Sequence, residues 1–241
     1  MAGRQAMNRG RLYGVGVGPG DTELLTLKAA RLLSQAKIVA YPAPNGKESL
    51  ARRIVAPLLA ETTRELSIVI PMDTSRDPAR EAYDAAAKTL AMHLEQGEDV
   101  LFLCEGDPFL YGSFMFIHER LRDAFDCMIV PGVTSLTACA AVLGRPLAAR
   151  NDVLKIIPAP LPEDRLRDEL RNVEAAAIIK IGRHFDKLRR LLDELRLSSR
   201  AALVEQATQG TQRVCRLDEM SDGQAGYFST ILIYGGCESW R

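Results

Sequence analysis

Continuously apolar runs alternate along the chain with longer stretches whose apolar positions recur at helical spacing. Val100–Cys104 is the clearest run, since it contains no polar position and is therefore typical of a strand buried on both faces of a sheet. In Glu23–Gln35 the leucines and Ala30 fall three or four residues apart, as on one face of a helix. Strand and helix alternate in this way as far as Leu143, which predicts an α/β domain with a mostly parallel sheet.

The second part of the chain repeats this alternation only at first. Gly144–Asp152 contains turn formers and little periodicity, so we place a boundary there and expect an N-terminal α/β domain over residues 1–148 and a C-terminal mixed α/β domain over residues 149–241. Near the end, Gln212–Leu217 and Tyr227–Tyr234 favour strands with no helix between them, which predicts antiparallel pairing. The expected strands are Arg11–Val17, Ile38–Tyr41, Leu66–Ile70, Val100–Cys104, Cys127–Val130, Val153–Ile157, Ala175–Ile181, Ala201–Glu205 and the two just named. The expected helices are Glu23–Gln35, Ser49–Leu59, Pro78–Glu95, Phe114–Arg122, an Ala-rich helix ending at Leu143, Glu163–Arg171 and Phe185–Leu195.

Composition narrows the class of protein. The 31 basic and 31 acidic residues balance, so no overall field attracts nucleic acid or an anionic membrane. No apolar run reaches the length of a membrane span, and the first residues do not have the order of a signal peptide, so we expect a cytoplasmic protein. The five cysteines include no C-x-x-C pair and the three histidines are scattered, so we expect no bound metal.

The glycines after the first strand are the first candidate for a ligand-binding loop. Gly14, Gly16 and Gly18 invite comparison with the dinucleotide fingerprint G-x-G-x-x-G, but its third glycine would have to stand at position 19 or 21. These positions hold Pro19 and Asp21. A nicotinamide dinucleotide site is therefore disfavoured.

A second candidate loop follows the strand Val100–Cys104. Gly106 tolerates backbone angles closed to other residues and Pro108 fixes its own φ, so the chain turns sharply at the carboxyl end of the strand, where open parallel sheets bind ligands. Gly-Asp-Pro is also a common turn in which the aspartate bonds its own backbone. Thr134 and Ser135, which open a later helix, can likewise be a simple N-cap.

Three motifs together resemble the tetrapyrrole methyltransferases: Gly16–Asp21, Glu105–Pro108 and Pro131–Ser135, in the order and spacing of that family. The resemblance extends over nearly the whole chain. It implies a two-domain protein, usually a homodimer, that holds the co-substrate S-adenosylmethionine in a cleft between its domains. Glu105 and the segment Tyr111–Phe114 are similar to the branch that methylates C20 of precorrin-2, giving precorrin-3A in cobalamin biosynthesis.

The resemblance also implies roles for individual residues. Eight positions would contact the cofactor: Gly106, Asp107, Leu110, Thr134, Ser135, Ile181, Ala207 and Thr230. A carbon acceptor must lose a proton, and Glu105, Tyr111 and Asp21 are our candidates for the base because they lie on loops after strands. Asp21 can equally be the cap of its helix. Four basic residues are candidates to receive the carboxylates of the substrate: Arg52, Arg53, Lys155 and Arg183.

Three functions remain open at this point. The first is C20 methylation of metal-free precorrin-2. The second lies within the same family, with the cobalt-bearing substrate or another ring position. The third belongs to a different class, a nucleotide-binding module without catalysis, which would bind the cofactor and leave precorrin-2 unchanged.

Overall fold

The structure is a computed structural model that describes residues 9–43, 48–70, 77–220 and 224–234. The chain divides into two compact units, residues 1–134 and residues 135–241. This division comes earlier than the expected boundary at residue 148, because helix α5 (Ser135–Leu143) packs against strands of the second unit.

The first unit is built on a parallel five-stranded sheet in the order β3-β2-β4-β1-β5. Its strands are β1 (Leu12–Gly16), β2 (Ile38–Ala43), β3 (Arg64–Val69), β4 (Val100–Cys104) and β5 (Cys127–Val130). All its strand pairs are parallel, as the alternation of strand and helix predicted. Strand β4 lies between β2 and β1, and all its residues are buried, which explains why its sequence contains no polar position.

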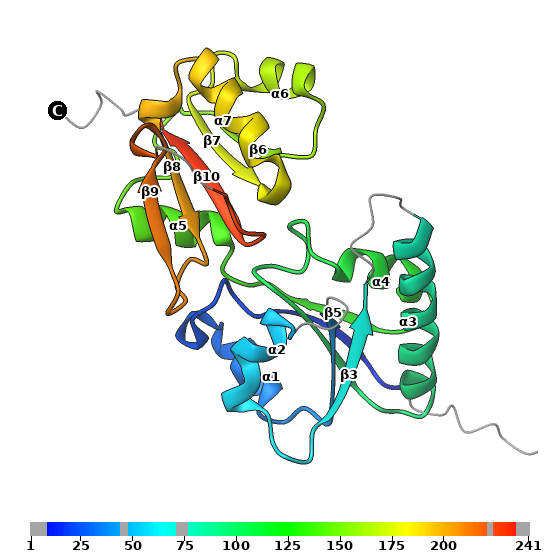
Figure 1. The fold of residues 1–241 in the computed structure, drawn as a ribbon. Coiled ribbons are helices and arrows are strands. Elements are labelled where there is room, and N and C mark those ends of the chain that lie inside the picture. Colours follow the sequence, from blue (N-terminus) through cyan, green and yellow to red (C-terminus); the bar gives the residue numbers. More distant parts are fainter. Residues whose placement is uncertain (1–8, 44–47, 71–76, 221–223, 235–241) are drawn as a thin grey trace, which may run out of the picture. The chain divides into compact units, whose positions relative to one another are not determined.

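Helices cover both faces of this sheet (Figure 1). Residues of α3 (Asp77–Glu95) and α4 (Phe114–Leu121) pack with alternate residues of β2 and β4 on one face. Those of α1 (Leu27–Leu33) and α2 (Leu50–Val55) pack on the other face. Such two-sided cover leaves the carboxyl ends of the strands and their loops as the place for chemistry.

The helix expected over Glu23–Gln35 is wrong as a single element. The chain forms a short 3₁₀ turn, η1 (Thr22–Leu24), and α1 begins only at Leu27. Between them Thr26 is extended, and its side chain accepts a hydrogen bond from the N–H of Ala29 as the N-cap of α1. Leu27 is 91% exposed although its spacing suggested the buried face. A similar short turn, η2 (Ala56–Leu58), follows α2.

The second unit contains a mixed five-stranded sheet in the order β6-β7-β10-β8-β9. Its strands are β6 (Leu154–Pro158), β7 (Ala175–Ile179), β8 (Ala201–Glu205), β9 (Arg213–Arg216) and β10 (Ser229–Tyr234). Strands β6 and β7 are parallel, and the other pairs are antiparallel, which confirms the mixed character. The last two strands do not pair with each other, however. Strand β10 is buried at five of its six positions and lies between β7 and β8, whereas the arginine-bearing β9 forms an edge.

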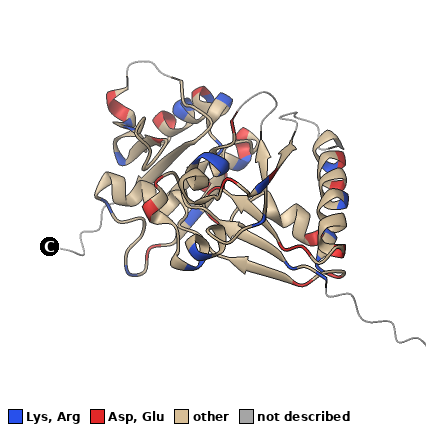
Figure 2. Cartoon of the chain, turned by 90° about the horizontal axis from the view of Figure 1, so that it is seen from below, with Lys and Arg blue, Asp and Glu red and all other residues tan. Residues whose placement is uncertain are grey.

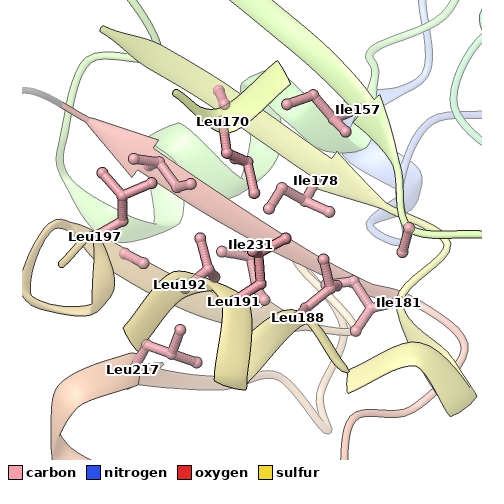
Figure 3. Packing of buried hydrophobic residues seen from close by; sticks show 14 of the residues in the cluster. Ile157, Leu170, Ile178, Ile181, Leu188, Leu191, Leu192, Leu197, Leu217 and Ile231 are labelled. Carbon is pink, nitrogen blue, oxygen red and sulfur yellow. The ribbon is translucent and has the colours of Figure 1, made fainter. Parts of the chain in front are cut away.

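The core of the second unit lies between its sheet and two helices, α6 (Glu163–Leu170) and α7 (Phe185–Glu194). Figure 3 shows leucines of α7 pointing at Ile178 and Ile231 of the sheet. Helix α5 packs on β10 and β8. Three 3₁₀ turns complete the unit: η3 (Gly182–His184), η4 (Ser198–Arg200) and η5 (Leu217–Glu219).

Two further properties of the described residues bear on function. None of their helices has both the length and the apolar character that a membrane crossing requires. Basic and acidic positions are interspersed along the ribbon in Figure 2, in line with the equal numbers of the two charges.

Candidate functional site

The three glycine-containing motifs meet at one edge of the first sheet. Strands β4, β1 and β5 are neighbours and parallel, so the loops that follow them emerge side by side. The N–H of Gly106 donates to the carbonyl of Gly18 at 2.8 Å, and the N–H of Gly18 donates back at 3.3 Å. These two backbone hydrogen bonds join the loop after β1 to the loop after β4.

The loops approach so closely that only glycine fits. A Cβ on Gly132 would lie 2.0 Å from the carbonyl oxygen of Gly106, and one on Gly16 would lie 2.6 Å from the same oxygen. Gly106 itself has φ 65°, in the left-handed region. The carbonyl of Gly106 is thus the point around which the backbone of all three motifs is packed.

Asp107 joins two of these loops through its side chain. One carboxylate oxygen accepts the N–H of Phe109 at 2.8 Å, and the other accepts the N–H of Gly132 at 3.0 Å. The first bond is the local turn that the Gly-Asp-Pro sequence favours. The second reaches across to the loop after β5, so Asp107 does more than close its own turn.

Glu105 points away from the solvent. Its carboxylate accepts a hydrogen bond from the N–H of Ala51 at 3.3 Å, in the first turn of α2. Burial raises the pKa of the Glu105 carboxyl, and the hydrogen bonds from its own backbone and from Ala51 offset this only in part. A carboxyl group whose pKa is shifted by burial beside ligand-type loops is a candidate for function.

The other two candidate bases differ in their surroundings. Asp21 accepts the N–H of Glu23 at 2.8 Å and is the N-cap of η1, so it has the capping role that the sequence left open. Tyr111 lies in the loop after β4 with φ 57°, and its side chain is 43% exposed. Leu110, beside it, is half-buried.

The predicted cofactor residues of the second unit gather at one edge of its sheet. Ile181 follows β7, Ala207 follows β8, and Thr230 lies near the start of β10, the antiparallel strand between those two. All three are buried. The side chain of Ile181 belongs to the core in Figure 3, and the hydroxyl of Thr230 is hydrogen-bonded with the thiol of Cys139. The side chains of Ile181 and Thr230 therefore have structural roles within the second unit.

Thr134 and Ser135 stand at the division between the units. Thr134 is the last residue of the first unit, and Ser135 begins α5. Both are half-buried.

Residues with positive φ mark the same strand ends. Of the seven non-glycine residues with positive φ among those described, Asn172 and Arg196 directly follow the C-caps of helices, a common place for this conformation. Four others are neighbours of predicted cofactor residues, namely Tyr111 beside Leu110, Lys180 beside Ile181, and Gln206 and Thr208 on either side of Ala207. Because such conformations cost free energy in non-glycine residues, they are typical of ligand-binding and active sites.

The basic residues proposed for substrate carboxylates are engaged to different degrees. Arg52 forms a bidentate pair with Glu65, with nitrogen–oxygen distances of 3.0 and 2.9 Å. Lys155 donates to the backbone carbonyl of Glu169 at 2.7 Å and pairs with its carboxylate. Arg53 lies 4.0 Å from Glu48. Arg183 takes part in no ion pair recorded for the described residues and lies next to His184.

The structure places two further residues at this strand edge that were not among the individual candidates from the sequence. Gly132 contacts the loops of the other two motifs through Gly106 and Gly16. The signal in the sequence that could have identified it is that each of the three motifs contains a glycine. Phe109 follows Pro108 and is 46% exposed. Among the described residues, no group of three or more His, Cys, Asp or Glu is arranged to hold a metal ion.

Comparison with known proteins places this geometry in a family. Residues 11–220 match the family model for tetrapyrrole (corrin/porphyrin) methylases. A precorrin-2 C(20)-methyltransferase from a Sinorhizobium species is 39% identical over 94% of this chain and 96% of its own. A cobalt-precorrin-2 C(20)-methyltransferase from Salmonella typhimurium is 33% identical over 93% and 96%. The crystal structure of a uroporphyrin-III C-methyltransferase from Thermus thermophilus, complexed with S-adenosyl homocysteine, matches with a TM-score of 0.68 and 26% identity over 93% of this chain and 92% of that one. The chain therefore belongs to the tetrapyrrole methylase family.

Proposed function

We propose that this protein is an S-adenosylmethionine-dependent C-methyltransferase that methylates C20 of precorrin-2 to give precorrin-3A in cobalamin biosynthesis. The observation that supports this most directly is the 39% identity, over nearly the full length of both chains, with a precorrin-2 C(20)-methyltransferase. The loops after β1, β4 and β5 support it further, since they bring the three family-like motifs together at one edge of the first sheet.

The residues present fit a cofactor of this kind. A sulfonium cofactor with an adenosyl group needs close backbone approach and small or apolar walls rather than reactive side chains. Gly106 offers a backbone without a side chain at the crowded strand edge, and Leu110 beside it is apolar. When bound, the cofactor supplies an already activated methyl group.

The chain's own residues would act mainly by positioning. Asp107 and the glycines hold the loops in one arrangement, so that the acceptor carbon and the methyl donor can be aligned without further ordering of the backbone. Such pre-organisation lowers the barrier because the entropy of alignment is lost on folding and binding rather than in the reaction.

For the proton that the acceptor carbon must lose, the surroundings favour Tyr111 among the three candidates. Its side chain is the most open to solvent at the strand edge, whereas Asp21 is a cap and Glu105 is turned toward α2. Replacing Tyr111 with phenylalanine removes the hydroxyl and keeps the ring. If the hydroxyl is the base, kcat should fall by about 10²-fold or more with little change in the KM for precorrin-2. An unchanged kcat would remove Tyr111 from this role.

The proposed reaction can be tested by incubating the protein with precorrin-2 and S-adenosylmethionine labelled in its methyl group. The product should gain one methyl by mass spectrometry, and carbon NMR should place the label at C20. A label at another ring carbon would contradict the C20 assignment while leaving methyltransferase activity intact.

Two alternatives can be separated in the same assay. The 33% identity with a cobalt-precorrin-2 C(20)-methyltransferase makes the cobalt-bearing macrocycle a second substrate to compare by kcat/KM. A nucleotide-binding module without catalysis would bind S-adenosylmethionine in a calorimetric titration and leave both macrocycles unchanged.

We propose in addition that the protein is a homodimer and acts in the cytoplasm. The first proposal rests on the usual state of the family and is tested by light scattering, which should give about twice the chain mass of 26.5 kDa. The second is tested by fractionating cells that produce the protein.

A further inference from the structure

Phe109 is an apolar side chain held firmly in an exposed position. Its ring is stacked on that of Phe114, with centroids 6.0 Å apart, and meets the ring of His118 edge-on at 5.2 Å. Phe114 is fully buried and also contacts Phe102 of β4. One side of the Phe109 ring is thus supported by the core, yet 46% of the residue remains exposed.

The backbone around Phe109 is built to keep it there. Its N–H donates to Asp107, the residue that also holds the loop after β5. Further along, the chain folds back so tightly that a Cβ on Gly112 would lie 2.5 Å from the carbonyl oxygen of Pro108. Tyr111, between them, has φ 57°. This loop holds Tyr111 in a strained conformation and exposes the aromatic side chains of Phe109 and Tyr111, and such strain is typical of sites that bind a ligand.

Phe116 is a second exposed aromatic residue of the same unit and serves as a comparison for Phe109. It lies on α4, is 45% exposed, and contacts the ring of Tyr83 of α3 in a tilted arrangement at a centroid distance of 4.7 Å. Phe109 and Phe116 therefore have similar exposure and similar aromatic support. They differ in position, because only Phe109 lies on one of the three packed loops, the loop after β4.

We propose that the ring of Phe109 is a stacking surface for the tetrapyrrole macrocycle, contacting the face of one of its pyrrole-derived rings. This inference rests on the proposed function, because it takes the substrate class from there. An unsaturated ring of the macrocycle is flat and apolar, and it carries its carboxylates on its rim. Such a ring can cover the exposed face of Phe109 while its charged groups stay in solvent or meet cations.

The proposal is tested by comparing Phe109→Ala with the matched control Phe116→Ala. Loss of one stacking surface should raise the KM for precorrin-2 by roughly three- to tenfold. The affinity for S-adenosyl homocysteine, measured by calorimetry, should stay within about twofold of the wild-type value. Phe116→Ala should leave both quantities unchanged. Phe109→Tyr retains the ring and should restore the KM of the wild type.

Direct binding separates this inference from the proposed function. The macrocycle is titrated into each variant in the presence of S-adenosyl homocysteine, so that no turnover takes place, and its absorbance is followed. Weakened binding in Phe109→Ala alone supports the stacking role even if the wild type transfers no methyl to precorrin-2. Equal binding by both alanine variants and the wild type overturns it. So does a wild type that binds no macrocycle. If Phe109→Ala loses thermal stability, Phe109→Tyr becomes the deciding variant. A folded Phe109→Tyr protein that binds the macrocycle more weakly than the wild type contradicts stacking by the ring.

Discussion

Removing the Asp107 carboxylate should loosen the connection between the loops after β4 and β5. The carboxylate accepts two backbone hydrogen bonds, from Phe109 at 2.8 Å and from Gly132 at 3.0 Å. Hydrogen bonds to a charged group contribute about 1.5–3 kcal/mol each, and the lower figure applies because Asp107 is only half-buried. Asp107→Ala should therefore lower the stability of the loop cluster by about 3 kcal/mol.

The substitution Asp107→Asn should remove only part of this stabilisation, and so separates the two hydrogen bonds. The amide side chain keeps one acceptor oxygen, and the local bond to Phe109 is easier to retain because it closes a short turn. Asp107→Asn should therefore lose mainly the bond from Gly132. A loss of about 1.4 kcal/mol in the opening free energy corresponds to a tenfold faster exchange of that amide proton.

Amide hydrogen exchange followed by NMR measures both bonds separately. In Asp107→Asn the Gly132 amide should exchange about tenfold faster while the Phe109 amide changes little, and in Asp107→Ala both should be faster. The affinity for S-adenosylmethionine should fall in the same order. Asp152→Ala is the control, because the Asp152 carboxylate accepts the N–H of Ala149 within a single turn. If the Gly132 amide exchanges at the wild-type rate in Asp107→Ala, Asp107 does not hold the loops together.

Two other substitutions test the site from its backbone and from its buried carboxyl group. Gly132→Ala should destabilise the fold by at least about 2 kcal/mol, because its Cβ would overlap the carbonyl oxygen of Gly106. The control Gly210→Ala has open space around it and should change the free energy of unfolding by no more than about 0.5 kcal/mol. Urea unfolding compares the two variants, and equal unfolding midpoints would contradict the crowding at Gly132. Since burial raises the folded-state pKa of Glu105 above its ordinary value of 4.5, the wild type should lose stability relative to Glu105→Gln as the pH rises from 4.5 through that raised pKa. Parallel stability curves of these two proteins from pH 4 to 8 would show that the carboxyl is not desolvated.

Much of the local structure could be predicted because it depends on local pattern. Strands β4, β5 and β8 have the predicted bounds, since each is a short apolar run with clear turn residues nearby. The break at Thr26 escaped prediction because the leucine spacing continues through it. The hydrogen bond that decides the start of α1 is donated by the N–H of Ala29 and accepted by Thr26, a threonine that nothing distinguishes in the sequence. The position of β10 between β7 and β8 also depended on contacts distant in sequence.

The candidate site was predictable in its parts and not in its contacts. The motifs identified Gly106 and Asp107, but not that the Asp107 carboxylate reaches Gly132. The sequence also left Glu105 as a general candidate base, and only the structure shows that its carboxyl is turned toward Ala51. Arg52, a candidate for binding substrate carboxylates, is held in a bidentate pair with Glu65. In each case the partner is far away in the chain, so no local pattern specifies it.

By itself, the sequence determined the α/β class, the strand-ending loops and the family resemblance, because these follow from hydrophobic periodicity, from the special backbones of glycine and proline, and from motif order. The tertiary structure decided which loop atoms touch. Parallel pairing of β4 with β1 and of β1 with β5 brings Gly16 and Gly132, which are distant from Gly106 in sequence, against the carbonyl of Gly106. It also exposes the ring of Phe109 while burying the carboxyl of Glu105, two outcomes that depend on packing between segments far apart in the chain.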